Sequence, residues 1–172
     1  MPVVLGLDPG TRHFGWGLVA RHGTRLAHVA HGVVHTDERR TIAERLVTIE
    51  RALLGVLEEH TPDEASVEAL FFAKDAQAAA KLGHARGVAL LVCARAGLGV
   101  HEYAPALVKR ALTGTGRAEK TQVAQMIRVV LALPAAPPSD AADALAVAVT
   151  HLMRVPALVP DGRGTRTRAR AT

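Results

Sequence analysis

The fold is decided near the start of the chain, by the stretch Val3-Val4-Leu5-Gly6-Leu7-Asp8-Pro9-Gly10-Thr11. Its first five residues form a short apolar run with β-branched side chains, which predicts a buried strand. Pro9 and Gly10 are turn residues, so the chain leaves the sheet after Asp8 and returns as a second strand over residues 14–20. An ionised carboxylate at the edge of an apolar core needs a partner. Asp8 either caps this turn through backbone N–H groups or binds a metal ion, and the stretch alone favours the cap.

The composition predicts one domain of the α/β class. A chain of 172 residues can bury a single core of ordinary size. Hydrophobic residues make up 49% of the chain and aromatic residues only 3%, so the core must be built from Leu, Val and Ala, as when helices pack on a sheet. The single cysteine, Cys93, excludes an internal disulfide and is expected to be a small core residue. No signal peptide and no apolar run of 18 residues is present, so we expect a soluble, cytoplasmic protein.

The charge is basic overall and unevenly distributed. The net charge of +5 suggests a polyanionic partner. Much of it lies in the tail, since residues 1–160 carry 17 basic against 15 acidic groups. Residues 36–64 hold four basic and eight acidic groups, whereas residues 104–130 hold five basic groups against Glu119 alone. An acidic face and a basic face are therefore expected, a pattern typical of proteins that orient themselves on nucleic-acid phosphates.

The order of elements predicts a mixed sheet with helices around it. Strands over residues 3–7, 14–20 and 26–35 form an antiparallel meander. An amphipathic helix over residues 37–60 follows, with Thr36 marking its start and Pro62 its end. The remaining elements are strands at 65–69 and 99–103 and helices at 74–96, 105–112, 119–133 and 139–154. We expect five strands, the last two joined through crossover helices, in a domain of residues 1–155 followed by a basic, disordered tail of residues 156–172.

Acidic residues recur at the places where such sheets carry chemistry. Asp8 follows the first strand, and Glu68 lies at the end of the fourth. Asp140 and Asp143 begin the last helix and are three residues apart, so their side chains can face one point. Each has a simpler explanation as well. Glu68 can be a solvated strand-end residue, and the helix dipole favours acidic residues behind an N-cap such as Ser139.

Two other patterns do not form sites. The segment 114–121 resembles a phosphate-binding loop, but Glu119 stands where a glycine is required before Lys120. His28, His31 and His35 are too irregularly spaced for one metal site on a strand. Because alternate residues share a strand face, His31 and His35 are expected on the face opposite His28.

A family resemblance is carried by several motifs in a fixed order. The chain resembles the bacterial Holliday-junction resolvases of the RuvC type, members of the ribonuclease H-like superfamily. The matching motifs are Gly6-Leu7-Asp8-Pro9-Gly10-Thr11-Arg12, the segments 68–74 and 81–89, Tyr103, Val108-Lys109, the segment 114–120 and Asp140-Ala141-Ala142-Asp143. The resemblance covers the chain to about Arg154 and implies a ribonuclease H-like mixed five-stranded sheet flanked by helices.

The resemblance implies one acidic cluster of Asp8, Glu68, Asp140 and Asp143 that holds two Mg²⁺ or Mn²⁺ ions. Like charges this close need hard cations, for which all-oxygen ligands are suited. In the implied mechanism Asp8 bridges the metals, one metal activates water and the other stabilises the leaving 3′ oxygen, which leaves 5′-phosphate and 3′-hydroxyl ends. Asp140 stands where some family members have histidine, so its role is more open.

The resemblance also implies a set of DNA contacts. Lys109 and Lys120 match lysines beside the scissile strand, although lysines on helices usually form a solvated face. Phe71 matches an aromatic residue that stacks on a base at the junction centre. The full set of expected DNA-binding residues is Phe71, Lys74, Lys81, Arg86, Lys109, Arg117 and Lys120. Asp75 departs from the family, where an uncharged amide is expected, which leaves the contacts around Lys74 open.

The function implied is that of a crossover junction endodeoxyribonuclease, which resolves four-way DNA junctions by paired symmetric nicks. A nearly two-fold substrate and paired nicks imply a homodimer, for which the apolar face of residues 74–96 is a candidate surface. Cooperation with a branch-migration ATPase is a further implication. Two alternatives stay open: an actin-like nucleotide-binding protein, which length disfavours, and a junction-binding protein without catalysis, which the complete set of carboxylates disfavours.

Overall fold

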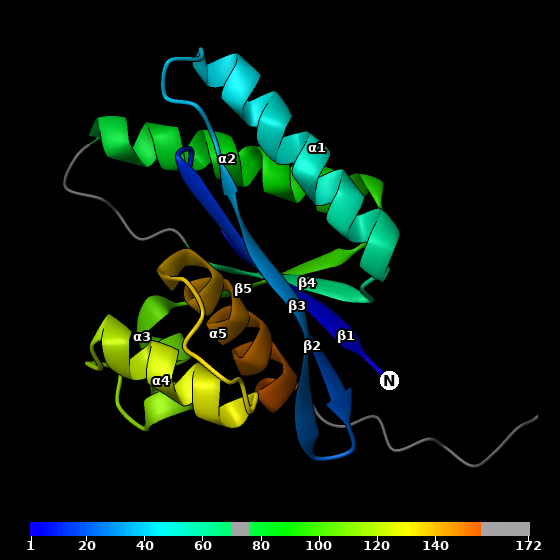
Figure 1. Cartoon of the computed structure of the whole chain (residues 1–172), viewed down its shortest axis with the longest axis vertical. Coiled ribbons are helices and arrows are strands. Elements are labelled where there is room, and N and C mark those ends of the chain that lie inside the picture. Colours follow the sequence, from blue (N-terminus) through cyan, green and yellow to red (C-terminus); the bar gives the residue numbers. More distant parts are fainter. Residues whose placement is uncertain (70–75, 156–172) are drawn as a thin grey trace, which may run out of the picture.

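Five strands form one mixed sheet in the order β3-β2-β1-β4-β5 (Figure 1). The strands are β1 (Val3–Asp8), β2 (His13–His22), β3 (Arg25–His35), β4 (Glu64–Glu68) and β5 (Gly99–Tyr103). β1, β2 and β3 pair antiparallel, whereas β1 pairs with β4 and β4 with β5 in parallel. The computed structural model describes residues 1–69 and 76–155. The predicted meander with two crossover-linked strands is thus confirmed.

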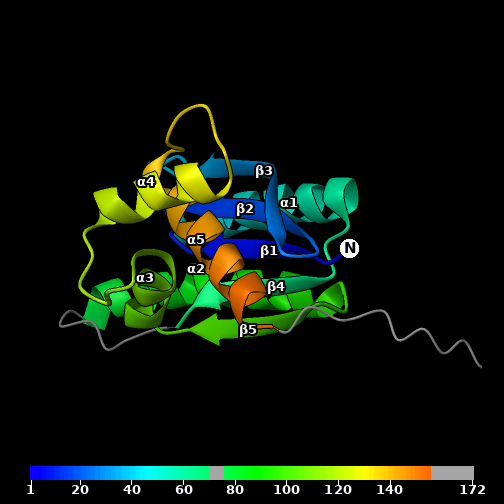
Figure 2. The same ribbon diagram turned by 90° about the horizontal axis from the view of Figure 1, so that it is seen from below.

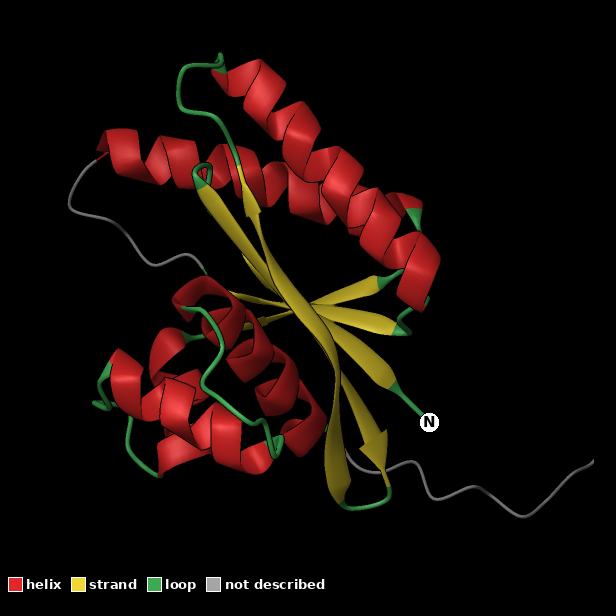
Figure 3. Ribbon diagram, in the orientation of Figure 1, coloured by secondary structure: helices red, strands yellow, loops and turns green. Residues whose placement is uncertain are grey.

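Helices cover both faces of this sheet (Figures 1 and 3). On one face lie α1 (Ile42–His60) and α2 (Ala76–Arg95), and on the other α3 (Pro105–Thr113), α4 (Lys120–Val130) and α5 (Ser139–Arg154). Each layer has its own core, because side chains alternate between the two faces of a strand. Leu5 and Leu7 pack with Ile49 and Leu53 of α1, whereas Val4 packs with the α5 side.

The first helix begins later than its hydrophobic pattern suggested. Thr36 was the predicted start, but α1 begins at Ile42 after a capping box in which Thr41 and Glu44 exchange side-chain to backbone hydrogen bonds. The Thr36 hydroxyl instead donates to the Thr11 carbonyl at 2.6 Å and so ties the end of β3 to the turn after β1. Similarly, the helix predicted over 119–133 is shorter, since α4 ends at Val130.

The predicted separation of His28 from His31 is wrong. The pairing of β2 with β3 shifts register between Leu18 and Val19, where β3 contains a bulge. Because one extra residue is inserted there, strict alternation fails, and His28 Nε2 lies 2.7 Å from His31 Nδ1.

Two further predictions concern membrane-spanning helices and the single cysteine. No helix within residues 1–69 and 76–155 is long and apolar enough to cross a membrane. Cys93 is free and buried, and burial raises the pKa of its thiol to about 11, as fits a core residue. The division into residues 1–155 and a tail from 156 stays a prediction.

Candidate active site

Three carboxylates from separate elements converge on one small cleft. Asp8 ends β1 and Glu68 ends β4, and these strands are parallel neighbours whose carboxyl ends meet at the same edge of the sheet (Figure 2). Asp143 reaches the same place from the second turn of α5. The cleft has a volume of about 240 Å³ and is completed by Pro105, Val108, Lys109, Lys120, Val123 and Ala146. The structure therefore brings together residues that are 60 and 75 positions apart in the sequence.

Glycines in the first two strands let α5 approach the sheet closely enough to place Asp143. A Cβ atom on Gly6 would overlap the carbonyl group of Ala144, and one on Gly15 would overlap that of Asp140. On Gly17 a Cβ would lie 2.6 Å from side-chain atoms of Leu145. Only glycine therefore fits under the helix at Gly6 and Gly15. Sequence reasoning missed this role, although glycines at 6, 15 and 17 in otherwise apolar strands are a signal of close backbone approach.

Burial and mutual repulsion disfavour the ionised form of the carboxylates in the cleft. Burial and, next, the charges of Asp143 and Asp140 raise the pKa of Asp8 from 3.8 to about 7, although Lys120 partly offsets the rise. Burial, followed by the charge of Asp143, also raises the pKa of Glu68, and Lys120 and Lys109 oppose this. Lys120 Nζ lies 2.8 Å from Asp143 Oδ2, and this hydrogen bond is the largest cause of the raised pKa of Lys120. The site thus favours binding of additional positive charge.

Asp140 lies at the margin of this cluster. It belongs to the first turn of α5, where the helix dipole favours an acidic residue, and it does not line the cleft. Its charge nevertheless contributes to the raised pKa of Asp8. The predicted N-cap differs slightly as well, since Ser139 is the first helical residue and Pro138 precedes it without a side-chain cap. Three of the four predicted carboxylates therefore line the cleft, and the fourth flanks it.

The predicted DNA-binding residues fall into distinct environments. Lys109 and Lys120 line the cleft. Arg117 lies with Arg110 around a depression lined by α3 and the loop that follows it, and Lys81 is exposed on α2. Phe71 and Lys74, like Asp75, lie outside the described residues.

Arg86 has a different environment from the other basic residues. Its side chain is only 7% exposed and forms a 2.7 Å salt bridge with Glu102 on β5. It also donates a hydrogen bond to the backbone carbonyl of Glu68 at 2.7 Å. A buried guanidinium with these partners fixes the end of β4, so the placement favours a positioning role for Arg86 over direct contact with DNA.

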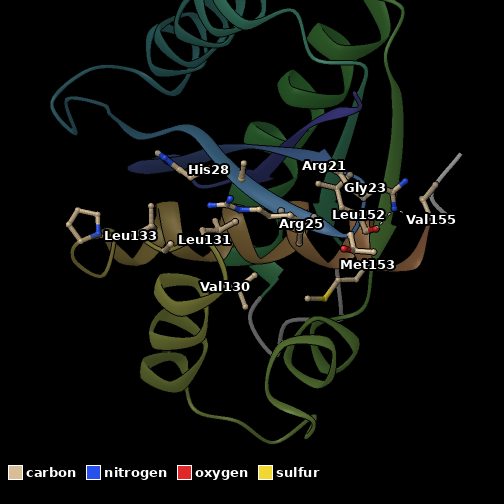
Figure 4. Close-up of a pocket in the computed structure, with 15 residues that line it drawn as sticks. Arg21, Gly23, Arg25, His28, Val130, Leu131, Leu133, Leu152, Met153 and Val155 are labelled. Atoms are coloured by element: carbon tan, nitrogen blue, oxygen red, sulfur yellow. Dashed lines mark hydrogen bonds between the residues drawn. The ribbon is translucent and has the colours of Figure 1, made fainter. Parts of the chain in front are cut away.

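A larger pocket lies away from the acidic cleft. It has a volume of about 900 Å³ and lies between the β2–β3 hairpin and the C-terminal ends of α4 and α5 (Figure 4). Leu131, Leu133 and Met153 line it, and Arg21 crosses one side to donate a 2.7 Å hydrogen bond to the Leu152 carbonyl. It contains no carboxylate among its lining residues. The predicted acidic residues Asp8, Glu68 and Asp143 therefore line the smaller cleft and not this pocket.

The sheet order, the helices on both faces and the carboxylates at adjacent strand ends define a nuclease of the ribonuclease H-like class. The family model described as crossover junction endodeoxyribonuclease RuvC matches residues 4–151. The chain belongs to this family of DNA endonucleases.

Individual relatives agree with the family assignment. The crossover junction endodeoxyribonuclease RuvC of Sorangium cellulosum is 63% identical over 149 residues, which cover 87% of this chain and 83% of the relative. The RuvC protein of Caulobacter vibrioides is 50% identical over 148 residues, which cover 86% of this chain and 88% of the relative. Among solved structures, RuvC of T. thermophilus in complex with a Holliday junction substrate superimposes with a TM-score of 0.83 at 41% identity, covering 88% of this chain and 93% of that one.

Proposed function

We propose that the protein resolves Holliday junctions by paired symmetric nicks, and that Asp8, Glu68 and Asp143 are its catalytic metal ligands, with Asp140 beside them. The observation that carries the proposal is the convergence of three carboxylates in one cleft flanked by two lysines, in a chain that belongs to the RuvC family. A cytoplasmic location fits an enzyme that acts on DNA.

The donor set fits two Mg²⁺ or Mn²⁺ ions. Every candidate ligand in the cleft is a carboxylate oxygen, the type that these cations prefer. Burial and the neighbouring carboxylates raise the pKa of Asp8 to about 7, which supports binding of a cation beside this residue. When bound, the cations would supply Lewis-acid stabilisation and an activated water for hydrolysis of a phosphodiester, leaving 5′-phosphate and 3′-hydroxyl ends.

The protein's own residues contribute position and charge. Asp8 and Glu68 are held on adjacent strands of a rigid sheet, and Asp143 on a helix packed against glycines, so their separation is fixed before substrate binds. Lys109 and Lys120 lie where they can neutralise a phosphate drawn into the cleft. The Lys120–Asp143 ion pair orients this lysine, whose side chain is 74% exposed and therefore accessible to DNA.

Binding to a four-way junction requires contacts beyond the cleft and a second active site. Lys81 and Arg117 are exposed and available for phosphates. Phe71 and Lys74 are proposed from the family motif alone. A homodimer would present two clefts to the two-fold substrate, and α2 is the proposed dimer surface, with Leu91 48% exposed on it. Cooperation with a branch-migration ATPase is the remaining part of the proposal.

The decisive experiment incubates the purified protein with an end-labelled, mobile four-way junction and either Mg²⁺ or Mn²⁺. We expect paired nicks at symmetric positions in opposing strands, ligatable without further processing. Junction binding without cleavage in both metals would instead support the non-catalytic alternative. Nucleotide hydrolysis without nicking would support the actin-like one.

The role of Lys109 is tested through the salt dependence of junction binding. Lys109→Ala should reduce cleavage and lower the slope of log affinity against log salt by about one phosphate contact. Arg51→Ala, at an exposed position on the acidic side of the molecule, is the matched control and should leave the slope unchanged. An equal slope in both variants would indicate that Lys109 does not contact a DNA phosphate and is only a solvated residue of α3.

A further inference from the structure

A second group of potential metal ligands lies at the other end of the same strand that carries Glu68. Glu64, His101 and His151 each offer one ligand atom, and these atoms all lie within 4.8 Å of one another. Glu64 begins β4, His101 lies on the neighbouring β5, and His151 belongs to the last turns of α5. Glu64 Oε2 is 2.6 Å from His151 Nε2, and Glu64 Oε1 is 3.8 Å from His101 Nε2.

This cluster is separate from the acidic cleft. Glu64 and Glu68 are four residues apart on one strand, a span of roughly 13 Å. Asp143 and His151 are eight residues apart on one helix, a span of roughly 12 Å. Figure 2 shows the C-terminal half of α5 over β4 and β5, so the cluster joins three elements at the end of the sheet remote from the candidate active site.

The most buried member, His151, is held as metal-binding histidines usually are. Its side chain is 1% exposed, and its Nδ1 atom lies 2.7 Å from the Tyr103 hydroxyl. With the proton on Nδ1, the ring donates to Tyr103 and turns the lone pair of Nε2 toward the Glu64 carboxylate. In this tautomer Nε2 and Glu64 Oε2, which lie 2.6 Å apart, repel each other unless a cation binds both; with the proton on Nε2 they form a hydrogen bond instead. A hydrogen-bond partner on the second ring nitrogen is the usual support of a ligating imidazole.

The donor set and the spacing select the metal. Two imidazoles and one carboxylate suit Zn²⁺, whereas Mg²⁺ prefers oxygen ligands throughout. Tetrahedral ligands about 2.0–2.1 Å from zinc lie roughly 3.3 Å from one another. The separations of 2.6 and 3.8 Å, which involve the two different oxygens of Glu64, lie on either side of this value, and all three ligand atoms lie within 4.8 Å of one another. Side-chain adjustments of about 1–1.5 Å therefore close the site. The side chains of His101 and Glu64 are 43% and 40% exposed, which leaves room for a water as fourth ligand.

We propose that Glu64, His101 and His151 form a zinc site, with water as the fourth ligand, which fastens α5 to β4 and β5. Zinc bound there adds a direct link between the helix that carries Asp143 and the strand that carries Glu68. Since metal binds the folded state, it raises the stability of the fold without taking part in the nuclease chemistry.

The test is a zinc titration of the full-length, metal-free protein against a chromophoric chelator, with no DNA present. We expect the wild type to bind one equivalent more than His101→Gln, a substitution at an exposed position that leaves the buried His151 in place. His22→Gln, at the exposed end of β2, is the matched control and should bind as the wild type does. Zinc should raise the Tm of the wild type and of His22→Gln by the same amount, and that of His101→Gln by less.

A third variant examines the support of His151. Tyr103→Phe keeps all three ligands and removes the hydroxyl, so zinc affinity should fall about 10- to 100-fold. Equal zinc stoichiometry in the wild type and His101→Gln would overturn the proposal and leave Glu64 and His151 as a hydrogen-bonded pair. Because the titration contains no DNA, this outcome is independent of whether the protein resolves junctions.

Discussion

Replacing Asp8 by asparagine should abolish cleavage and, in the absence of metal, stabilise the fold. The pKa of Asp8 is raised from 3.8 to about 7, so its ionised form is disfavoured in the folded protein by up to about 4 kcal/mol. Between these two pH values the folded state retains a proton that the unfolded state has lost. The stability of the metal-free wild type therefore falls as pH rises from about 4 to about 7 and levels off above that.

Urea unfolding in the presence of a chelator, followed by the fluorescence of Trp16, measures this effect. Asp8→Asn cannot ionise, so its advantage over the wild type should approach the full value of up to about 4 kcal/mol near pH 8 and nearly vanish near pH 4. Glu58→Gln, at an exposed position on α1, is the control and should show no such pH-dependent gain.

Excess Mg²⁺ should reverse the order of stability, because only the wild type keeps the Asp8 ligand and metal binds the folded state. Junction binding should persist in Asp8→Asn, since the substitution removes a charge that repels phosphates. A difference in unfolding free energy that stays constant across this pH range would refute the electrostatic argument. Cleavage by Asp8→Asn at a rate near that of the wild type would refute the metal assignment.

Three further substitutions test how the cleft is built. Gly6→Ala should destabilise the fold by about 3 kcal/mol or more and reduce cleavage, because the new methyl group displaces α5. Its control is Gly55→Ala, which has open space around its Cβ position in α1. In the same urea titration this variant should be more stable than the wild type by about 0.5–1 kcal/mol. Lys120→Met should lower cleavage about 100-fold at neutral pH and shift the pH–rate profile toward alkaline pH, since Lys120 lowers the pKa of Asp8; an unshifted profile would contradict this. Arg86→Leu should destabilise by about 1.5–3 kcal/mol and raise the Mg²⁺ concentration needed for half-maximal cleavage, whereas unchanged metal dependence would count against its positioning role.

The fold was predictable from the sequence where hydrophobic periodicity and turn residues agreed. β5 and α5 have the predicted bounds, and the strand order follows from the meander and the crossover helices. The start of α1 was not predicted, because Asp37 and Glu38 resemble a first helical turn while the capping box lies at Thr41. The contact between His28 and His31 depends on a bulge, which strict alternation of side chains cannot reveal.

The sequence predicted which residues belong to the candidate site, but not that they lie close together. Strand ends and a helix start mark Asp8, Glu68 and Asp143, but spacing in the sequence does not bring them together. Their convergence depends on the parallel pairing of β1 with β4 and on glycines that admit α5 to the sheet. Burial likewise distinguishes Arg86 from the exposed lysines, a difference that the charge pattern of the sequence does not contain.

The long separations within the acidic cleft have a consequence for the newly made protein. Asp8 lies on the first strand and is synthesised well before Asp143, which lies on the last helix of the described chain. No partial product that ends before α5 contains the three carboxylates, and none can assemble them until that helix has docked on the glycines of β1 and β2. The proposed active site is therefore completed only after α5 has been synthesised and has packed on the sheet, so we expect chains that end before α5 to lack cleavage activity.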